Sequence, residues 1–531
     1  MTGNLSVSAP RIDPVHRIDR LDIDRFRLRR FLDTLARNGE LIFHDDRVEL
    51  IEVAHLLEAT PQAIAFRNIG AQRDQLVGNV MASRKRLALA VDVDENELLA
   101  ELRRRLARPI PPVEVSSSEA PVHAVVWKGE DVDLTRLPLH LQHTLDGAPY
   151  ISSSLDFTTD HKTGRINVGC RRIMPLGRAI ASVDMNAPSD LRAMYLNALA
   201  AKHAMPVAFA IGSHPADFIG SQMLLPAADE VALIGAVRGG AVPLVRAKTI
   251  DQLVPADAEI ILEGYLDAAG YVEAEGPYGE YLGYYGKLKR NPLLRLTAVT
   301  MRKDALFQTV TIGGRNLART DTAQLTALRT EAAVWAALEG AVREPVSVHA
   351  SAASGGMFNV RFSLRPRYAG EARNALAAVL ACPAEVKQAF AVDDDIDVHS
   401  DQQMEWALAT RFQAERDLLL MTGMRAIPLD PSLGDARLGS KVGFDLTMPF
   451  GAKGSPEFSV PSVPHLDEMP DHYRTVEEVL ATGPKTFFEI MKAIGSCDGR
   501  EILRAFDDLR RQGRLQRIDD GRYALGSISS S

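Results

Sequence analysis

The hydrophobic pattern at the start of the chain predicts a small α+β domain. Between Asp24 and Asn38 apolar side chains recur at the spacing of one helix face, Glu40–Ile51 predicts strands, and Glu97–Leu106 predicts a second amphipathic helix. The segment 109–121 contains four prolines and three consecutive serines, which predict an exit linker.

A second pattern begins at His123 and continues to Arg315. Short β-rich runs are separated by turns, and helical patterns at Leu191–Ala204 and Asp229–Val237 interrupt them. An antiparallel sheet, or a partly open barrel, that carries a helical insert fits this order. The β-rich runs are Tyr150–Thr158, Pro206–Ile211, Glu259–Leu266, Leu293–Met301 and Leu306–Ile312.

After Arg315 helices and strands alternate, which predicts an α/β domain. The helices are expected at Asp321–Glu339, Gly370–Leu380 and Asp401–Thr410. The strands are expected at Ser347–Ala350, Phe358–Ser363 and Glu385–Asp397.

The last part of the chain follows a connector rich in proline and glycine. Three helical patterns and a hairpin succeed one another, with Asp519-Asp520-Gly521 as the hairpin turn. This order resembles a winged helix. Its third helix is predicted to carry Ile502, Leu503, Phe506 and Leu509 on one face.

These patterns together predict an α+β multidomain protein. The expected parts are a flexible arm at 1–20, an N-terminal α+β domain at 21–120, a central barrel domain at 121–320, a C-terminal α/β domain at 321–448, a linker at 449–473 and a winged-helix-like domain at 474–527.

The composition is that of an ordinary globular protein, with 46% hydrophobic and 24% charged residues. The net charge of −8 gives no global electrostatic reason to expect nucleic-acid binding. Cys170, Cys382 and Cys497 form no zinc-binding spacing and suggest reduced thiols in a cytoplasmic protein. We also see no signal peptide and no apolar run that would span a bilayer, so neither secretion nor membrane insertion is expected.

The strongest candidate for chemistry is the stretch A-E-G-P-Y-G-E-Y-L-G, which places Glu275 and Glu280 on either side of a tight turn. Pro277 fixes φ at one turn position while Gly276 and Gly279 relieve the backbone, so the two glutamates are predicted to face one space. Like carboxylates held close do not both ionise easily, so one is expected to keep a proton and serve as a general acid. The alternative is a surface hairpin tip that carries two solvated charges.

Other catalytic signatures are absent. The sequence has no G-x-x-x-x-G-K-[ST], no H-E-x-x-H and no G-x-S-x-G, which removes the usual support for a P-loop enzyme, a zincin or a nucleophile-elbow hydrolase. Six separated pieces do agree with one another. They are I-N-V-G-C-R-R at 166–172, D-E-V-A-L-I-G-A-V-R-G at 229–239, A-E-I-I-L-E-G-Y at 258–265, E-G-P-Y-G-E-Y-L-G-Y-Y at 275–285, D-D-D-I-D-V at 393–398 with W-A-L-A-T-R at 406–411, and L-G-S-K-V-G-F-D at 438–445.

In this order, over roughly residues 20 to 450, these pieces resemble the UbiD family of decarboxylases that use prenylated FMN. The resemblance implies a central split β-barrel of the flavin-reductase type and a C-terminal domain that helps to form a homodimer or homohexamer. It implies a covalent adduct between the cofactor and an aromatic, heteroaromatic or α,β-unsaturated carboxylic acid, a divalent metal (Mn²⁺ or Mg²⁺), K⁺ as a further candidate ion, and a flavin prenyltransferase as supplier of the cofactor.

The resemblance also assigns residues. The family's catalytic Glu-Arg-Glu set falls on Glu275, Arg172 and Glu280. The residues that match cofactor contacts are Asn167, Cys170, Arg171, Arg172 and Lys441. Taken alone, Asn167 is read as a turn residue and Lys441 as a solvated charge.

Two metal ligands of the family match Asn167 and Glu230, whose oxygens suit a hard cation. The third ligand of the family is a histidine, and the corresponding region here, S-V-D-M-N-A-P-S-D, has none. Asn186 takes its place if a two-residue deletion is allowed, with Asp184 and Asp190 as rivals. The departure is also consistent with weaker metal binding.

Removal of CO₂ from such acids leaves an electron pair that no side chain can absorb, so a cofactor must accept it. We expect Glu280 to return the proton, with Arg172 and Glu275 orienting the substrate. Two alternatives stay open: a relative that acts on an aryl-CoA thioester or as a carboxylase, and a non-catalytic winged-helix regulator. Acidic residues on the third helix of the terminal module make nucleic-acid binding the less favoured role.

Overall fold

The computed structural model describes residues 22–160, 162–223, 229–452, 460–461, 463–464, 473–519 and 521–526. These residues divide into two compact units, with the division between Thr447 and Met448. The expected arm at 1–20, most of the expected linker and Asp520 of the expected hairpin turn lie outside the described residues.

The first unit begins with a four-stranded sheet in the order β1-β2-β3-β18. Its strands are β1 (Leu41–His44), β2 (Ala63–Ile69), β3 (Asp74–Gly78) and β18 (Phe307–Gln308). The helices here are α1 (Leu28–Arg37), α2 (Val53–Ala59), α3 (Arg84–Ala90) and α4 (Leu98–Leu106). Strand β18 comes from far along the chain, so this sheet is completed by the domain that follows it.

The segment 109–121, expected to be a linker, contributes a strand to a second small sheet. Strand β4 (Val113–Glu114) pairs with β10 (Pro243–Arg246), which in turn pairs with β11 (Leu253–Pro255). The stretch Glu40–Ile51, expected to form strands, forms β1 and an isolated parallel bridge between Val48 and Ile69, and then enters a 3₁₀ turn at Leu50–Glu52.

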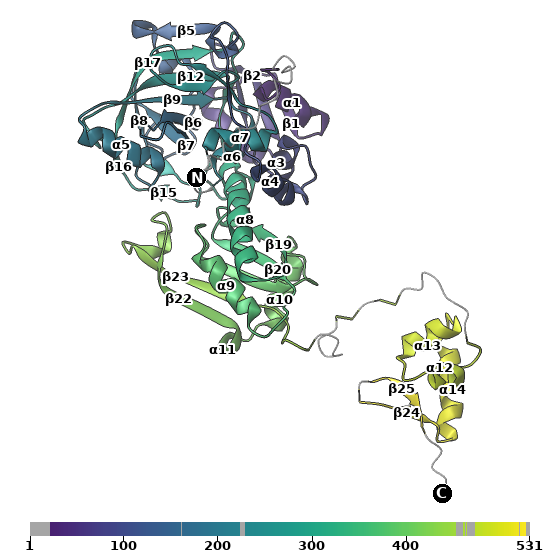
Figure 1. Cartoon of the computed structure of the whole chain (residues 1–531). Helices are drawn as coiled ribbons and strands as arrows, with labels where there is room; N and C mark the ends of the chain where they lie inside the picture. Colours follow the sequence, from purple (N-terminus) through teal and green to yellow (C-terminus); the bar gives the residue numbers. More distant parts are fainter. Residues whose placement is uncertain are drawn as a thin grey trace, which may run out of the picture. The chain divides into compact units, whose positions relative to one another are not determined.

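The central domain is a closed barrel. Its strands follow one another as β12-β9-β6-β7-β8-β17, and the pairing of β17 with β12 closes the ring of six, while β5 extends the sheet from β17 (Figure 1). The expected barrel is thus confirmed, and it is closed where a partly open one had been considered. The strands are β5 (Val125–Lys128), β6 (Ile151–Thr159), β7 (Ile166–Pro175), β8 (Ile180–Val183), β9 (Met205–Ile211), β12 (Ile260–Leu266) and β17 (Leu293–Met301).

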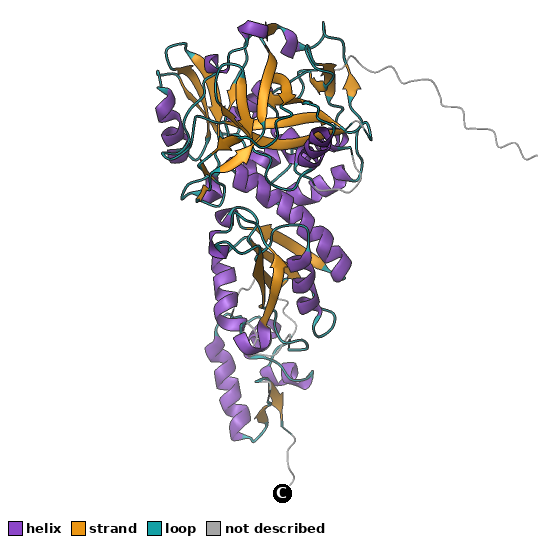
Figure 2. Cartoon of the chain, turned by 90° about the vertical axis from the view of Figure 1, so that its left-hand side faces the viewer, coloured by secondary structure: helices purple, strands orange, loops and turns teal. Residues whose placement is uncertain are grey.

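Strand alternation explains why the barrel wall is apolar on both faces. In β9, Val207, Phe209 and Ile211 pack into one hydrophobic cluster, whereas Ala208 and Ala210 pack into another. Successive side chains of a strand point to opposite faces, so this strand is buried on both sides. Helices flank the strands on the outside, as the purple and orange elements of Figure 2 show.

The helical insert comprises α5 (Asp190–Ala200), α6 (Pro215–Ser221) and α7 (Glu230–Arg238). Arg238, at the end of α7, is buried and donates to Asp217 of α6 and to Asp257. A buried arginine requires such partners, because an unpaired charge in the interior is costly. This contact fixes α6 and α7 against the chain segment that leads into β12.

The C-terminal domain of the first unit has a five-stranded mixed sheet in the order β19-β20-β21-β23-β22. Its strands are β19 (Pro345–Ala350), β20 (Asn359–Leu364), β21 (Gln388–Asp393), β22 (Leu418–Arg425) and β23 (Leu438–Asp445). Its helices are α8 (Asp321–Ala341), α9 (Glu371–Ala381), α10 (Asp401–Arg411) and α11 (Ala414–Asp417). Strand β22 is an edge strand, and the expected homo-oligomer stays a prediction.

The second unit contains α12 (Val476–Ala481), α13 (Phe487–Ile494), α14 (Gly499–Arg511), β24 (Leu515–Arg517) and β25 (Tyr523–Leu525). Lys485, between the first two helices, forms a bridge to Tyr523, which gives the element order of a winged helix. Ile502, Phe506 and Leu509 are buried, but Leu503 is 57% exposed. The prediction for Leu503 was wrong, because it lies one position, about 100°, around the helix from Ile502.

Candidate active site

Both glutamates of the central turn are buried. Glu275 ends β13 (Glu273–Glu275) and is 1% exposed, and Glu280 follows β14 (Tyr278–Gly279) and is 4% exposed. Strand β13 pairs with β16 (Lys289–Asn291), and β14 pairs with β15 (Tyr285–Gly286). The Gly276–Pro277 peptide bond is cis. Because both glutamates are buried, the alternative of a surface hairpin tip with solvated charges is wrong.

Arg172, on β7, joins the two glutamates. Its Nε and Nη2 donate to the two carboxylate oxygens of Glu275 at 2.9 and 3.1 Å, and its Nη1 donates to Oε1 of Glu280 at 2.9 Å. The ring of Tyr278 lies 4.4 Å from the guanidinium carbon and covers one face of it. The structure thus brings together the three residues of the predicted catalytic set.

Two further charged residues complete this cluster, and the sequence did not assign either of them a part in it. Asp184 contacts Nη2 of Arg172 at 3.0 Å, and Lys289 lies 3.8 Å from Asp184 and 3.6 Å from Oε1 of Glu280. Burial by itself lowers the pKa of Arg172, but the carboxylates of Asp184, Glu280 and Glu275 outweigh it and raise that pKa well above its ordinary value. We call Arg172, Lys289, Asp184, Glu275 and Glu280 the charged cluster.

Two asparagines tie the charged cluster together. Asn291 donates through Nδ2 to Glu275 at 3.2 Å. Asn186 donates through Nδ2 to Oδ1 of Asn291 at 2.5 Å and to Asp184 at 3.2 Å. Asn186, predicted as a third metal ligand, thus contacts the charged cluster, and Asp184, its rival, belongs to it.

The loop that contains His143 and Asp146 packs against the turn between the two glutamates. Asp146 accepts a hydrogen bond from the Gly279 amide at 2.9 Å, and the His143 ring packs directly on Gly279. A Cβ atom at Gly279 would lie 2.3 Å from Nδ1 of His143, which is too close for any real contact. Gly279 is therefore required by this close approach.

We expect Gly279→Ala to lower kcat by about 10²-fold, because a displacement of about 1 Å at a catalytic group costs this much. Steady-state kinetics measures the loss. The double variant Gly279→Ala with His143→Ala removes the clashing ring and should recover part of the activity. Equal activity of the single variant and the unmodified protein would contradict the requirement.

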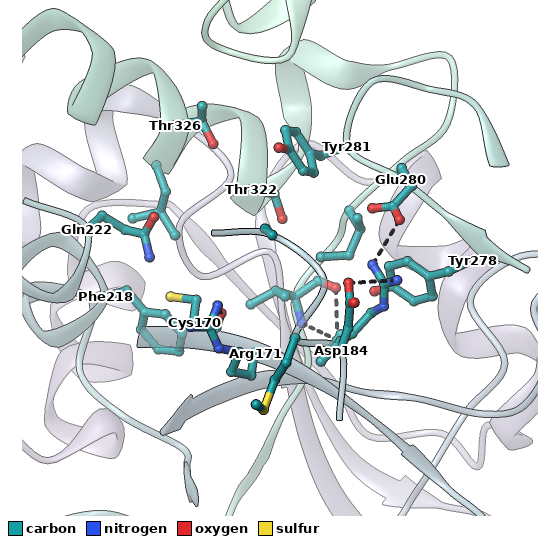
Figure 3. A pocket seen from close by; sticks show the side chains of 17 residues that line it. Cys170, Arg171, Asp184, Phe218, Gln222, Tyr278, Glu280, Tyr281, Thr322 and Thr326 are labelled. Atoms are coloured by element: carbon teal, nitrogen blue, oxygen red, sulfur yellow. Dashed lines mark hydrogen bonds and ion pairs between the residues drawn. The ribbon is translucent and has the colours of Figure 1, made fainter. Parts of the chain in front are cut away.

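Three members of the charged cluster, Arg172, Asp184 and Glu280, line one end of a pocket of about 200 Å³. Figure 3 shows Glu280, Asp184 and Tyr278 at this end, with Cys170, Phe218 and Gln222 at the other, while Tyr281, Thr322 and Thr326 line a third side. The rest of the lining includes the apolar side chains Met185, Ala187, Val310, Ile312 and Leu325. The pocket therefore presents a charged end to an interior lined by both apolar and polar side chains.

Cys170 and Arg171 are neighbours on β7, and both line the pocket. Arg171 pairs with the buried Asp156 at 3.2 Å and lines the pocket. Burial raises the pKa of the Cys170 thiol to about 11, so this cysteine is a neutral wall residue and not a thiolate nucleophile.

The two candidate metal ligands from the family match lie close to Asp156. Asn167, a buried residue of β7 and not a turn residue, donates through Nδ2 to Asp156 at 2.6 Å, and Glu230 accepts the amide hydrogen of Val168. Burial raises the pKa of Glu230 to about 7; the charges of Asp156 and Asp190 act in the same direction, and the Val168 amide opposes them. A cation here would offset this accumulation of acidic groups.

No group of three or more His, Cys, Asp and Glu side chains able to hold a metal ion occurs among the residues that the structure describes. The amide oxygen of Asn167 and the carboxylate of Glu230 nevertheless suit Mg²⁺ or Mn²⁺, which accept water and phosphate as remaining ligands. These two donors fit a metal ion whose remaining ligands are water and the phosphate of a bound cofactor.

Lys441 lies elsewhere. It is a residue of β23, 8% exposed, and its ammonium donates to the carbonyl of Leu380 at 2.8 Å. It lines a separate cavity together with Glu385, Lys387 and Arg425. Lys441 is therefore not a solvated charge, and the structure does not bring it to the pocket that Arg171 and Arg172 line.

The site thus consists of a buried arginine held between two glutamates at one end of a pocket. Comparison with protein families identifies the class. The model of the 3-octaprenyl-4-hydroxybenzoate carboxy-lyase Rift-related domain matches residues 113–316, and the models of the N-terminal and C-terminal domains of the same carboxy-lyase match 32–106 and 323–446. The chain belongs to the UbiD family and is a carboxy-lyase.

Among relatives, the anhydromevalonate phosphate decarboxylase of Methanothermobacter thermautotrophicus is 26% identical over 427 residues, which cover 80% of this chain and 97% of the relative. The UbiD-class enzyme HmfF of Pelotomaculum thermopropionicum, solved with FMN, has a TM-score of 0.78 at 30% identity and covers 83% of this chain and 98% of its own. An evolved dimeric form of HmfF, solved with prFMN, has a TM-score of 0.75 at 28% identity, with 84% and 99% covered.

The apo 3,4-dihydroxybenzoic acid decarboxylase of Enterobacter cloacae has a TM-score of 0.77 at 26% identity, and 83% of this chain and 98% of that chain are covered. The similarity to the family models ends at residue 446, before the winged-helix-like unit. No helix within the described part of the chain has the length and apolar character needed to cross a membrane.

Proposed function

We propose that the protein catalyses the reversible, non-oxidative decarboxylation of an aromatic, heteroaromatic or α,β-unsaturated carboxylic acid with prenylated FMN as cofactor. The observation that carries this proposal is the buried contact of Arg172 with Glu275 and Glu280 at one end of a pocket whose lining mixes apolar and polar side chains. The HmfF structures with FMN and with prFMN support the choice of cofactor.

The cofactor, when bound, supplies the electron sink that the side chains lack. Cys170 and Arg171 on β7 line the pocket and would hold it, together with a metal at Asn167 and Glu230. Lys441, which is outside this pocket, stays a predicted contact.

The residues of the chain have three tasks. Arg172 and Glu275 hold the substrate carboxylate in position, because the bidentate contact between them locks the guanidinium in one orientation. Glu280 gives a proton to the substrate carbon after the C–C bond to CO₂ breaks. The apolar side chains of the lining disfavour water beside the substrate, which leaves Glu280 as the proton source.

The activity is tested with protein co-expressed with a flavin prenyltransferase. We expect CO₂ release from at least one member of a panel of aromatic, heteroaromatic and unsaturated acids. Protein made without the prenyltransferase should carry plain FMN and release none, because plain FMN lacks the electrophilic ring. Equal activity of both preparations would contradict the proposed cofactor.

We expect Glu230→Gln to lower the Mn²⁺ retained by the purified protein by about 10-fold or more, because a neutral amide replaces the one charged ligand of the proposed pair. Metal analysis of the purified protein measures the retained Mn²⁺. Asp133→Asn, which removes the same charge at a side chain that is 17% exposed and accepts from Thr135, is the control and should retain the metal. Full retention by Glu230→Gln would show that the metal is held elsewhere.

A further inference from the structure

One wall of the pocket carries hydroxyl groups without a partner in the described part of the chain. Tyr281, directly after Glu280, and Thr326, on α8 and 7% exposed, both line the pocket (Figure 3). Neither hydroxyl forms a hydrogen bond with a described residue, whereas the hydroxyl of Thr322 donates to the carbonyl of Thr311. Buried polar groups are normally hydrogen-bonded, so two open hydroxyls on one wall indicate a polar ligand.

Both hydroxyls can act as hydrogen-bond donors. Burial raises the pKa of the Tyr281 phenol to about 12, so this group keeps its proton at neutral pH and can give its O–H to an acceptor. The hydroxyl of Thr326 provides a second O–H on the same wall. Carboxylate oxygens are strong acceptors for such donors, because a hydrogen bond to a charged group is shorter and stronger than one between neutral groups.

Arg329, a half-buried residue of α8, supplies a positive charge behind this wall. Thr322, Thr326 and Arg329 have the spacing i, i+4 and i+7, which puts them on one face of the helix. A helical side chain leans toward the N-terminus of its helix, so the side chain of Arg329 leans toward Thr326 and the pocket. Among the charges that act on the phenol of Tyr281, that of Arg329 has the largest effect and lowers its pKa. The guanidinium therefore lies near this hydroxyl.

The charge of Arg329 is not neutralised by the described residues. Its side chain forms no ion pair and no hydrogen bond with any of them. Glu385, which acts on the same phenol, is engaged by Arg425 at 2.7 Å. Arg171 and Arg172, the arginines that line the pocket, both have carboxylate partners. A half-buried cation without a counter-charge is costly, so an anionic group of a ligand is the expected partner of Arg329.

We propose that Tyr281, Thr326 and Arg329 form a subsite for a second carboxylate, so that the substrate is an aromatic or unsaturated dicarboxylic acid. This inference rests on the proposed function and deepens it. The reacting carboxylate lies at the end of the pocket that Arg172 lines, and the second carboxylate accepts from the two hydroxyls with the charge of Arg329 behind them. The second carboxylate stays on the product: one C–C bond breaks, its electron pair takes up a proton, and the sum is ⁻OOC–R–COO⁻ + H⁺ → ⁻OOC–R–H + CO₂.

Isothermal titration calorimetry of the holoenzyme tests the subsite. The probes are three diacids (isophthalate, terephthalate and trans,trans-muconate), the monoacid benzoate, and 4-carbamoylbenzoate, in which a neutral amide replaces the second carboxylate of terephthalate. We expect at least one diacid to bind about 10–100-fold more tightly than both monoacids, the range for a hydrogen bond to a charged group. A diacid that is turned over is followed through kcat/KM instead. Equal or weaker binding of all three diacids would overturn the inference.

Variants of the three residues locate the effect. Arg329→Met should lower the affinity for the preferred diacid by about 10–100-fold and abolish its advantage over benzoate. Arg329→Lys keeps the charge and should recover part of this loss. Tyr281→Phe and Thr326→Val each remove one donor and should lower the diacid affinity by about 3–10-fold. Arg178→Met, which removes a charge at a side chain that is 78% exposed, is the control and should keep the preference.

Two results for Arg329→Met would also overturn the inference: an unchanged diacid preference, and a parallel loss of benzoate affinity. The proposed metal at Asn167 and Glu230 provides for the phosphate of the cofactor, so the absorbance spectrum of Arg329→Met should show the cofactor retained. Its loss would assign Arg329 to the cofactor instead. The proposed function is read separately, from CO₂ release. Decarboxylation of monoacids without a diacid preference would leave the function and remove the subsite, and a diacid preference without CO₂ release would do the reverse.

Discussion

Glu280→Gln is expected to lower kcat by about 10²–10⁴-fold, the range that a positioned proton donor contributes, while the bound cofactor is retained. The amide keeps the size of the side chain and can still accept the hydrogen bond that Arg172 donates at 2.9 Å. It cannot give up a proton as a carboxyl group does. The pocket and the Arg172–Glu275 contact should therefore survive while the proton transfer fails.

Kinetics with any acid that the panel identifies measures this loss, and the absorbance spectrum of the purified variant shows whether the cofactor is present. Glu275→Gln is the matched comparison. It weakens the bidentate contact with Arg172, so it should raise KM as well as lower kcat. Full activity of Glu280→Gln would show that another group donates the proton.

Arg172→Met is expected to abolish turnover and to lower the stability of the first unit by about 3–5 kcal/mol, the cost of removing one partner from a buried ion pair. The change leaves Glu275 and Glu280 buried beside Asp184 with Lys289 as the remaining cation of the charged cluster. The carboxyl groups must then take up protons or admit water, and either outcome disrupts the pocket.

Thermal unfolding measures the stability effect. Arg172→Lys keeps the charge but not the bidentate geometry, so it should be more stable than Arg172→Met and still have low activity. An Arg172→Met protein with unchanged melting temperature would show that the contacts of the guanidinium do not stabilise the fold.

Much of the fold follows from local pattern. The amphipathic repeat predicted α4 and α10 to within one residue of their ends, and the prolonged repeat after Thr320 predicted the long helix α8. These elements bury a stripe of side chains that the sequence displays directly. The predicted run Leu306–Ile312 became the two-residue β18, because it pairs with β3 of a different domain and only over that length.

The residues of the candidate site that belong to short sequence motifs could be predicted. Those that reach the site through the pairing of one strand with another could not. Glu275, Glu280 and Arg172 were identified from short motifs. Lys289 was missed because it looks like any exposed lysine in the sequence; it reaches the charged cluster because β16 pairs with β13 and places Lys289 opposite Glu275. Asn186 was assigned to a metal, yet its amide contacts Asn291 of the same β16 strand.

The sequence by itself determined the family, many of the helices and strands, and the pair of glutamates flanking a proline, because each of these depends on residues close together along the chain. Only the tertiary structure decided that the barrel closes, that an arginine 103 positions before Glu275 lies between the two glutamates, and that Asp184 and Lys289 join them. The physical reason is distance: charges interact strongly only within a few ångströms in the interior, and strand pairing sets which charges come that close.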